Sequence, residues 1–420
     1  MGGKWKKEKF SELCTITRGG SPRPIHNYIM DKGIPWVKIA DATASNSRTI
    51  NSTKEYIKST GKQKSREVFP GDLILSNSAT PGLPKFMGIY ACIHDGWLLL
   101  RDFNGLHKEF CYYFLLHERE NLVSQGNGSV FTNLKTDILK NHVVDVPTLS
   151  EQRAIAHILG TLDDKIELNR QMAQTLESIA RAIFKSWFVD FDPVKPKMEG
   201  KQPEGMSEEV AALFPDKFVE SELGMIPEGG EVLKFPEEFD FTMGQSPPGS
   251  SYNEYFNGVP FYQGSADFGQ WYPTERIYCT APTRFANKGD VLFSVRAPVG
   301  DMNIALSDCA IGRGLCCIRH KSGSTALTYL YLTNTKSVME HNAGEGAVFK
   351  SLSKKQLTML PVVSIPDVIA KSFIKIVDPI FEKIQSLEDN ARTLCSLRDT
   401  LLPRLISGKI RLNQPEDAAA

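Results

Sequence analysis

The chain carries one sequence unit twice, and this duplication restricts its fold more than any other feature. Gly71-Asp-Leu-Ile-Leu-Ser76 returns as Gly289-Asp-Val-Leu-Phe-Ser294, 218 residues later. Ile34-Pro-Trp-Val37 similarly resembles Val259-Pro-Phe-Tyr262. Solenoid repeats are only about 20–50 residues long, so this period indicates a duplicated domain rather than a solenoid. A chain of 420 residues is long enough for two such domains, each with its own core.

Each copy has the composition of short strands joined by turns. The first block covers residues 1–147, in which runs such as 72–76 predict strands and 108–122 predicts a helix. The second block covers 231–365 and is equally rich in glycine, proline and β-branched residues. Between 193 and 230, prolines and glycines are interleaved with charged residues, which predicts a linker that lies over the surface.

Each block is followed by a segment whose apolar residues recur at alternating spacings of three and four. The first segment, 148–192, begins near Ser150, which we expect to be the helix N-cap. The second segment, 366–412, precedes a short tail at 413–420. This spacing is typical of a coiled-coil seam. The predicted helix seam residues are Ile155, Leu159, Leu162, Ile166, Leu176, Ile183, Ile380, Ile384, Leu387, Leu394, Leu401 and Leu405.

Two polar residues, Asn169 and Arg398, stand at seam positions of the two predicted helices. One interpretation is that they fix the register of two paired helices, as single polar seam residues do in coiled coils. The other is that the seam drifts away from the interface at these points. The sequence favours neither.

Helices of about 40 residues with a continuous apolar stripe are not stable alone in water. Antiparallel pairing would bury both stripes and would give the chain an internal pseudo-twofold axis. The alternative is that each helix packs against its own block. We therefore predict an α+β fold, with two similar mixed α/β domains separated by a long antiparallel two-helix coiled coil.

The composition is that of a globular chain, with 41% hydrophobic and 23% charged residues. No apolar run approaches the roughly 18 residues that span a bilayer, and the first residues lack the core of a signal peptide. We therefore expect a cytoplasmic protein. The eight cysteines are scattered without a C-x-x-C pair, which favours reduced thiols over disulfides or a zinc site.

The chain lacks the short motifs that mark common enzyme sites. It contains no phosphate-binding G-x-x-x-x-G-K-[ST], no dinucleotide-binding glycine fingerprint, no H-E-x-x-H and no nucleophile elbow. We therefore expect neither a catalytic residue nor a metal site, and predict that the chain is not itself an enzyme.

The two similar blocks, each followed by a predicted long helix, resemble the specificity (S) subunit of type I restriction–modification enzymes. The resemblance covers nearly the whole chain. Its motifs are the turns at 19–22 and 244–247, the segment 34–41, the strands 71–76 and 289–294, Glu151-Gln-Arg-Ala-Ile-Ala156, and 223–229.

The resemblance implies two target-recognition domains, each of which reads one half of a bipartite sequence in double-stranded DNA. It implies that the two helices act as a spacer and as the docking platform for two modification (methyltransferase) subunits. S-adenosylmethionine would be bound by those subunits, and ATP and Mg would be used by separate restriction subunits. No cofactor is expected in this chain.

The formal net charge of the whole chain is zero, which is not typical of a uniformly basic DNA-binding protein. Residues 1–127 contain 18 Lys/Arg and 12 Asp/Glu, a net charge of +6. Residues 231–345 contain 9 and 12, a net charge of −3. If both copies bind DNA, the second must do so with a locally basic face on an acidic body.

Exposed cations, amides and aromatic residues are the candidate DNA contacts, because cations hold phosphates and Arg, Asn and Gln read base edges. The predicted contacts in the first block are Lys38, Lys54, Lys58, Lys62, Lys64, Arg66, Asn77 and Lys85. Those in the second block are Tyr262, Gln263, Arg276, Arg284, Arg296 and Arg313. Gln263 and Arg296 are the first choices for base reading. For any single lysine, an ordinary solvated loop is an equally good explanation.

An aromatic group, Phe184, Trp187, Phe188 and Phe191, exceeds what a two-helix seam requires. It predicts either a further protein partner or a cap that packs the helix against a recognition domain, and the cap is the simpler explanation. The rival to DNA recognition is a non-catalytic coiled-coil scaffold that assembles protein partners without DNA, which the zero net charge favours.

Overall fold

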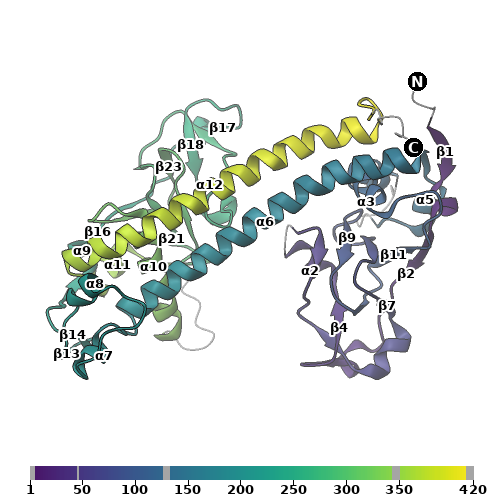
Figure 1. Ribbon diagram of the computed structural model, residues 1–420. Coiled ribbons are helices and arrows are strands. Elements are labelled where there is room, and N and C mark those ends of the chain that lie inside the picture. Colours follow the sequence, from purple (N-terminus) through teal and green to yellow (C-terminus); the bar gives the residue numbers. More distant parts are fainter. Residues whose placement is uncertain (1–4, 45–46, 126–132, 343–350, 413–420) are drawn as a thin grey trace, which may run out of the picture. The chain divides into compact units, whose positions relative to one another are not determined.

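The computed structural model describes residues 5–44, 47–125, 133–342 and 351–412. The chain folds as two compact units: Met1–Gln171 with Glu388–Ala420, and Met172–Leu387. Each unit combines strands with helices, as the predicted α+β class requires, and two long helices contribute residues to both (Figure 1). The predicted tail, 413–420, lies outside the described residues.

Two five-stranded sheets and a separate strand pair form the first unit. The sheets have the orders β3-β6-β4-β10-β7 and β2-β11-β8-β9-β5, and β1 pairs with β12. The strands are β1 (Lys6–Lys9), β2 (Thr15–Arg18), β3 (Ile29–Met30), β4 (Ile34–Val37), β5 (Thr49–Ile50), β6 (Tyr56–Ile57), β7 (Arg66–Val68), β8 (Leu73–Ser76), β9 (Pro84–Met87), β10 (Ala91–Ile93), β11 (Trp97–Arg101) and β12 (Val143–Val146). The helices are α1 (Phe10–Leu13), α2 (Ile39–Thr43), α3 (Lys108–His117), α4 (Arg119–Ser124) and α5 (Thr136–Asn141).

The second unit repeats this topology. Its sheets have the orders β17-β19-β18-β23-β20 and β16-β24-β21-β22, and β15 pairs with β25. The strands are β15 (Val232–Lys234), β16 (Phe239–Met243), β17 (Tyr252–Asn253), β18 (Val259–Tyr262), β19 (Tyr278–Cys279), β20 (Phe285–Ala286), β21 (Val291–Ser294), β22 (Met302–Ile304), β23 (Cys309–Ile311), β24 (Leu315–His320) and β25 (Pro361–Val363). The helices are α9 (Phe235–Glu238), α10 (Thr325–Asn342) and α11 (Lys354–Thr358). Each strand of the second unit named here therefore has a counterpart in the first.

Central strands of both units are buried on both faces. Leu98 and Leu100 of β11 face the core that also contains α3, whereas Trp97 and Leu99 face the core between the sheets. This alternation follows from the two-residue period of a strand. In β24, Cys316 and Cys317 likewise point into different cores, and no disulfide joins the described cysteines.

The repeated glycines have a conformational reason. Gly71 and Gly289 have φ of +87° and +85°, in the left-handed region that residues with a Cβ avoid. Their N–H groups donate to the carbonyls of Met87 and Ala305, at 2.7 and 2.9 Å. The same turn therefore leads into β8 and into β21.

Two helices of 40 residues each, α6 (Leu149–Phe188) and α12 (Asp367–Ile406), follow the two predicted spacer segments. None of the twelve predicted seam residues is exposed. The expected N-cap is wrong by two positions, because α6 begins before Ser150 and the Thr148 hydroxyl accepts from the Glu151 N–H at 3.3 Å.

Within each unit, the parts of α6 and α12 pack together in opposite directions. In the first unit, Ile155 and Leu159 share a core with Leu405, near the end of α12. In the second unit, the Phe184 ring lies 5.8 Å from that of Phe373, near the start of α12. Early residues of one helix thus meet late residues of the other, as predicted for antiparallel pairing. Each stretch also packs on its own unit's domain, so the two alternatives are not exclusive.

The two polar seam residues behave differently, although both lie in the first unit. Arg398 donates to Asp163 of the facing helix at 2.7 Å, and the side chain of Asp163 is only 10% exposed. Asn169 is buried, and its Nδ2 has no hydrogen-bond partner among the described residues. Arg398 therefore supports the register interpretation, whereas Asn169 provides no directional contact.

The segment 193–230 is more ordered than the predicted linker. It contains α7 (Val194–Met198), α8 (Glu208–Ala212), β13 (Phe218–Ser221) and β14 (Gly224–Pro227). Val194, Phe214 and Ile226 are buried, and the first two belong to the core of the second unit. The interpretation as a surface linker is corrected here, because scattered apolar residues between the prolines anchor the segment.

Phe373 supplies the test of helix packing in the second unit. Its ring lies 5.8, 5.5 and 4.9 Å from those of Phe184, Trp187 and Phe188. We expect Phe373→Ala to lower the free energy of unfolding by about 3–5 kcal/mol, because it leaves a cavity in a closed core. Urea denaturation measures this, with Ile376→Ala, at a 38% exposed site of the same helix, as the control. Similar small losses for both variants would contradict the role of Phe373.

Candidate DNA-recognition surface

In the second unit, three segments distant in sequence meet at Ser246. The Ser246 hydroxyl accepts from Nε2 of Gln263 at 2.7 Å and from the backbone N–H of Arg313 at 3.4 Å. We call residues 244–247, Gln263 and 312–314 the second loop cluster. The side chains of Gln263 and Arg313 are exposed there. An amide and a guanidinium are the groups that read base edges in the major groove.

Glycines make this close approach possible. A Cβ on Gly312 would lie 2.8 Å from Oε1 of Gln263, and one on Gly314 would lie 2.6 Å from the Gln263 carbonyl oxygen. The Gly314 N–H donates to that carbonyl at 3.1 Å. The Gly-Arg-Gly sequence therefore fixes the backbone of Arg313 and leaves its side chain free to point outward.

The first unit has an equivalent arrangement with different side chains. His94-Asp95-Gly96 corresponds to Gly312-Arg313-Gly314 at the repeat offset, and Lys38 follows β4 as Gln263 follows β18. Ser21 donates to Asp95 at 2.6 Å, and Arg18 donates to the Asp95 carbonyl at 2.9 Å. We call residues 18–23, Lys38 and 94–96 the first loop cluster.

The first loop cluster holds several charges close together. The Asp95 carboxylate has two cationic or titratable neighbours: Nε2 of His94 lies 3.0 Å from one of its oxygens, and a guanidinium nitrogen of Arg23 lies 3.7 Å from the other. Burial lowers the pKa of His94, as do Lys38, Arg23 and Arg18, although Asp95 opposes this. Burial acts to raise the pKa of Asp95, but the hydrogen bond from Ser21 and the cations nearby lower it overall. At neutral pH the cluster thus presents an ionised carboxylate among cations.

Five of the basic residues predicted in the first block lie between positions 54 and 66, on and around β6, β7 and the 3₁₀ turn that joins them, and three of the five have side-chain partners. Lys62 pairs with Glu67 at 2.9 Å, Lys64 donates to the Tyr28 hydroxyl at 2.6 Å, and Lys58 donates to the Asn27 carbonyl at 2.8 Å. The side chains of Lys54 and Arg66 are exposed. Lys38 forms an ion pair with Glu55 and lies over the Trp36 ring.

Three predicted contacts are contradicted by burial. Asn77 is 5% exposed, and its Nδ2 donates to the Asp95 carbonyl at 3.2 Å. Lys85 donates to the Ser47 carbonyl, and burial lowers its pKa. Tyr262 is buried in the core between the sheets, and burial raises its pKa. The residues before them, Ser76, Pro84 and Phe261, are buried as well, so these strands show no alternation between buried and exposed side chains.

The predicted arginines of the second unit are all exposed, but they are not equivalent. Arg276 is engaged by Asp267 at 2.8 Å and lies 3.9 Å from Glu254. Arg296 forms an isolated backbone bridge with Ser351. Arg284 lies next to β20, and Arg313 lies in the second loop cluster. The structure therefore brings Gln263 together with Arg313.

The motif Glu151-Gln152 at the start of α6 has a structural role. Gln152 is fully buried; its Oε1 accepts from the His107 N–H at 2.6 Å, and its Nε2 donates to the Gly105 carbonyl at 2.9 Å. Glu151 accepts from Trp5 at 3.1 Å and from Arg411 at 2.7 Å. These bonds tie the helix to the first domain, which explains the residue types without invoking DNA.

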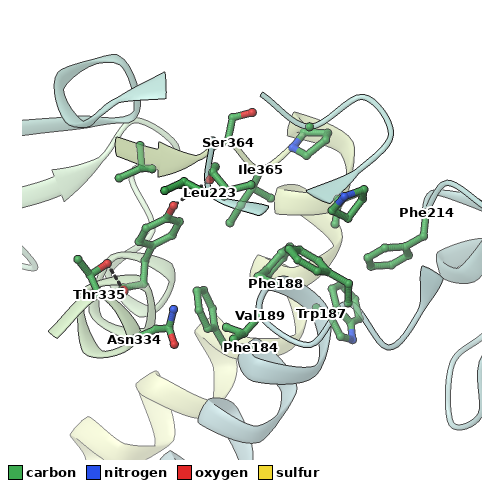
Figure 2. A pocket seen from close by; sticks show the side chains of 18 of the residues that line it. Phe184, Trp187, Phe188, Val189, Phe214, Leu223, Asn334, Thr335, Ser364 and Ile365 are labelled. Carbon is green, nitrogen blue, oxygen red and sulfur yellow. Dashed lines mark hydrogen bonds between the residues drawn. The ribbon is translucent and has the colours of Figure 1, made fainter. Parts of the chain in front are cut away.

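An apolar cavity of about 420 Å³ lies in the second unit at the end of α6 (Figure 2). Phe184, Trp187 and Phe188 line it, together with residues of the segments 214–230 and 360–369. Trp187 and Phe191 also contact Phe214 and Phe218, with ring centroids 5.1 and 6.0 Å apart. The aromatic group therefore caps the helix against its own unit, as the simpler of the two interpretations predicted.

The family comparison accounts for the duplicated arrangement. The family model described as the type I restriction modification DNA specificity domain matches residues 2–178 and again 227–390. The chain belongs to this family.

Curated relatives agree with the family assignment. The chain is similar to the putative type I restriction enzyme MjaX specificity subunit of Methanocaldococcus jannaschii, at 30% identity, covering 97% of this chain and 94% of the relative. It is also similar to the type I restriction enzyme HindI specificity subunit of Haemophilus influenzae, at 24% identity, covering 87% and 92%.

A solved structure supports the fold of this family member. The crystal structure of the type I restriction-modification system S subunit from M. genitalium aligns with a TM-score of 0.57 at 16% identity, covering 98% of this chain and 96% of that one. No helix among the described residues is long and apolar enough to cross a membrane. The same residues contain no group of three metal-ligating side chains.

The DNA contacts predicted from the sequence do not include Arg18, Arg23, His94 or Asp95 of the first loop cluster. The repeat itself held the signal. Arg313 was a candidate in the second block, and subtracting the offset of 218 leads to Asp95. Asp95 is acidic, and a carboxylate can accept a hydrogen bond from the amino group of cytosine.

The first loop cluster predicts a pH dependence of stability. Because the pKa of His94 is lowered on folding, the unfolded chain binds protons more readily, and stability falls as the pH drops below the ordinary histidine value of about 6.5. We expect His94→Gln to reduce this loss between about pH 7.5 and 5.5, as measured by urea denaturation. The exposed His26→Gln is the control. An unchanged pH profile in His94→Gln would refute the assignment.

Proposed function

We propose that this chain is the DNA-recognition subunit of a type I restriction–modification complex and that each loop cluster reads one half of a bipartite target. The observation that carries the proposal is the pair of clusters at equivalent places in a duplicated fold. Their backbones match, but Lys38 and Asp95 in one correspond to Gln263 and Arg313 in the other. Two readers with one scaffold and different side chains suit two half-sites of different sequence.

The proposal assigns no chemistry to this chain. Methyltransferase subunits would dock on α6 and α12 and bind S-adenosylmethionine. Restriction subunits would use ATP and Mg. The names of the curated relatives, which are specificity subunits of type I restriction enzymes, support this division of labour. Exposed apolar residues on the outward faces of the helices, including Leu168, Met172, Ile179 and Leu397, are the proposed docking positions.

Co-expression with a methyltransferase subunit tests the proposal as a whole. The purified complex is incubated with a library of duplexes in which two segments and the gap between them are randomised, and the bound fraction is sequenced. We expect a bipartite consensus with a fixed gap. A complex that forms but selects no sequence would favour a scaffold role instead.

Arg313 and Lys54 are expected to act differently on the selected duplex. Arg313→Ala should lower the discrimination between bases at one position of a single half-site by about 1–3 kcal/mol, because it removes hydrogen bonds to a base edge. Lys54→Ala should weaken binding to all sequences. It should also reduce the slope of log affinity against log salt concentration by about the value of one phosphate contact. Fluorescence anisotropy at several salt concentrations measures both. If Arg313→Ala lowered affinity equally for every sequence, Arg313 would not be a base reader.

The helices are proposed to set the gap between half-sites. We expect four residues inserted after Gln174 of α6, with four more after Ser386 of α12, to lengthen the paired helices by about 6 Å. Ala173 and Leu387, next to these sites, share one core, so the insertions extend facing stretches. The selected gap should grow by about two base pairs, at 3.4 Å each, without a change in either half-site. An unchanged gap would disprove the spacer role.

A further inference from the structure

The loop between β17 and β18 presents two aromatic side chains to solvent. Tyr255 is 87% exposed and Phe256 is 76% exposed, more than any other large apolar side chain among the described residues. We call residues 254–257 the aromatic tip. Single exposed apolar residues are common, but two adjacent exposed aromatic rings in one loop are unusual.

The aromatic tip is held in a defined shape. Oδ1 of Asn253 accepts from the N–H groups of Tyr255 and Asn257 at 3.0 and 3.2 Å, and its Nδ2 donates to the Asn257 carbonyl at 2.8 Å. A Cβ on Gly258 would lie 2.1 Å from the Cys279 carbonyl oxygen, so only glycine fits after the tip. One asparagine side chain thus closes the loop.

Phe256 adopts a backbone conformation that is costly for a bulky residue. Its φ is +60°, in the left-handed region where glycine or asparagine is usual. Its ring lies 5.0 Å from that of Tyr278, which braces it from one side and leaves the other side exposed. Strain of this kind persists where the surrounding structure enforces it, and it is concentrated at functional sites.

The first unit lacks this feature. Its β3–β4 turn consists of Asp31, Lys32 and Gly33, whereas the β17–β18 loop has the five residues 254–258. Gly33 and Gly258 each stand directly before the next strand. When the two loops are aligned on these glycines, the second is two residues longer, and it carries the aromatic pair. The duplicated fold did not require the tip, because the first copy forms the same sheet without it.

Charge also distinguishes the two units. Residues 1–127 have a net charge of +6, whereas residues 231–345 have a net charge of −3. Arg276, near the tip, is engaged by Asp267 and Glu254, so it is poorly placed to neutralise a phosphate. Although Arg284, Arg296 and Arg313 are exposed, the acidic second unit is less suited than the first to bind phosphates, and a further source of affinity is expected. Stacking of an aromatic ring on a base supplies one that does not depend on counterion release.

We propose that the aromatic tip inserts into the groove of the second half-site and that Tyr255 stacks on a base or wedges into a base step, with Phe256 as its support. This inference rests on the proposed function, because it assumes that the second unit reads duplex DNA. A stable protein interface instead buries roughly 800 Å² on each partner, far more than a four-residue tip offers. Pyrimidine–purine steps, which unstack easily, are the expected contact point.

The test uses the complex with its methyltransferase subunit and the duplex that the wild-type complex selects from a randomised library. Tyr255→Ala, Phe256→Gly and the double variant are compared with Phe285→Ala. Phe285 is 50% exposed on β20, at the opposite edge of the same sheet. Glycine at position 256 removes the ring and permits the positive φ, so this variant should retain its thermal stability.

We expect the double variant to bind the selected duplex about 10- to 100-fold more weakly, with an unchanged slope of affinity against salt. Scrambling the sequence of the second half-site should then lower the affinity of the double variant less than it lowers the affinity of the wild type. 2-Aminopurine placed in that half-site should brighten on binding of the wild-type complex and not of the variant, because insertion unstacks the base. Phe285→Ala should behave as the wild type.

Three outcomes overturn the inference, and each is distinct. If the wild type selects a bipartite duplex and the double variant binds it within about twofold, the tip does not contact DNA. If the double variant instead fails to assemble with the methyltransferase subunit, the tip is a protein contact. If the wild type selects no duplex at all, the proposed function itself fails.

Discussion

Burial of the apolar seams of α6 and α12 is the constraint on which the rest of the structure depends. A helix of 40 residues with an exposed apolar stripe would not persist in water, so each stripe must be covered along its length. Each unit buries the part of the two stripes that lies within it. Leu159 and Leu405 belong to one core, and Phe184 and Phe373 belong to the other. The first unit is therefore completed by two separate stretches of sequence, Met1–Gln171 and Glu388–Ala420, whereas the second is contiguous from Met172 to Leu387.

The two sheets of each unit provide rigid support for variable loops. Strands such as β11 and β24 are buried on both faces, which leaves little freedom for their ends to move. The loop clusters are attached to these ends and closed by glycines whose missing side chains permit close backbone approach. Side chains on such loops can change without cost to the core. This separation of scaffold from reader explains how one fold can serve two unlike half-sites.

The difference in charge between the units gives them different means of binding. In the first unit, exposed Lys54 and Arg66 accompany a cluster that combines a carboxylate with cations. In the second unit, acidic residues engage Arg276, and the exposed groups proposed to contact DNA are Gln263, Arg313 and the aromatic tip. Affinity in the first should therefore respond strongly to salt, whereas affinity in the second should depend more on contact with the bases.

The sequence by itself determined the duplication, the class of each block and the seam of each long helix, because spacing of apolar residues is a local property that survives without coordinates. It also identified Gln263 and Arg313 as exposed polar groups. Only the tertiary structure decided that Asn77, Lys85 and Tyr262 are buried, because the residues before them are buried too and no alternation in the sequence marks an exposed face. It alone placed Asp95 and Arg313 at equivalent sites, joined Arg398 to Asp163 and packed the supposed linker into a core. These contacts join residues far apart in the chain, and no local pattern specifies which of them will meet.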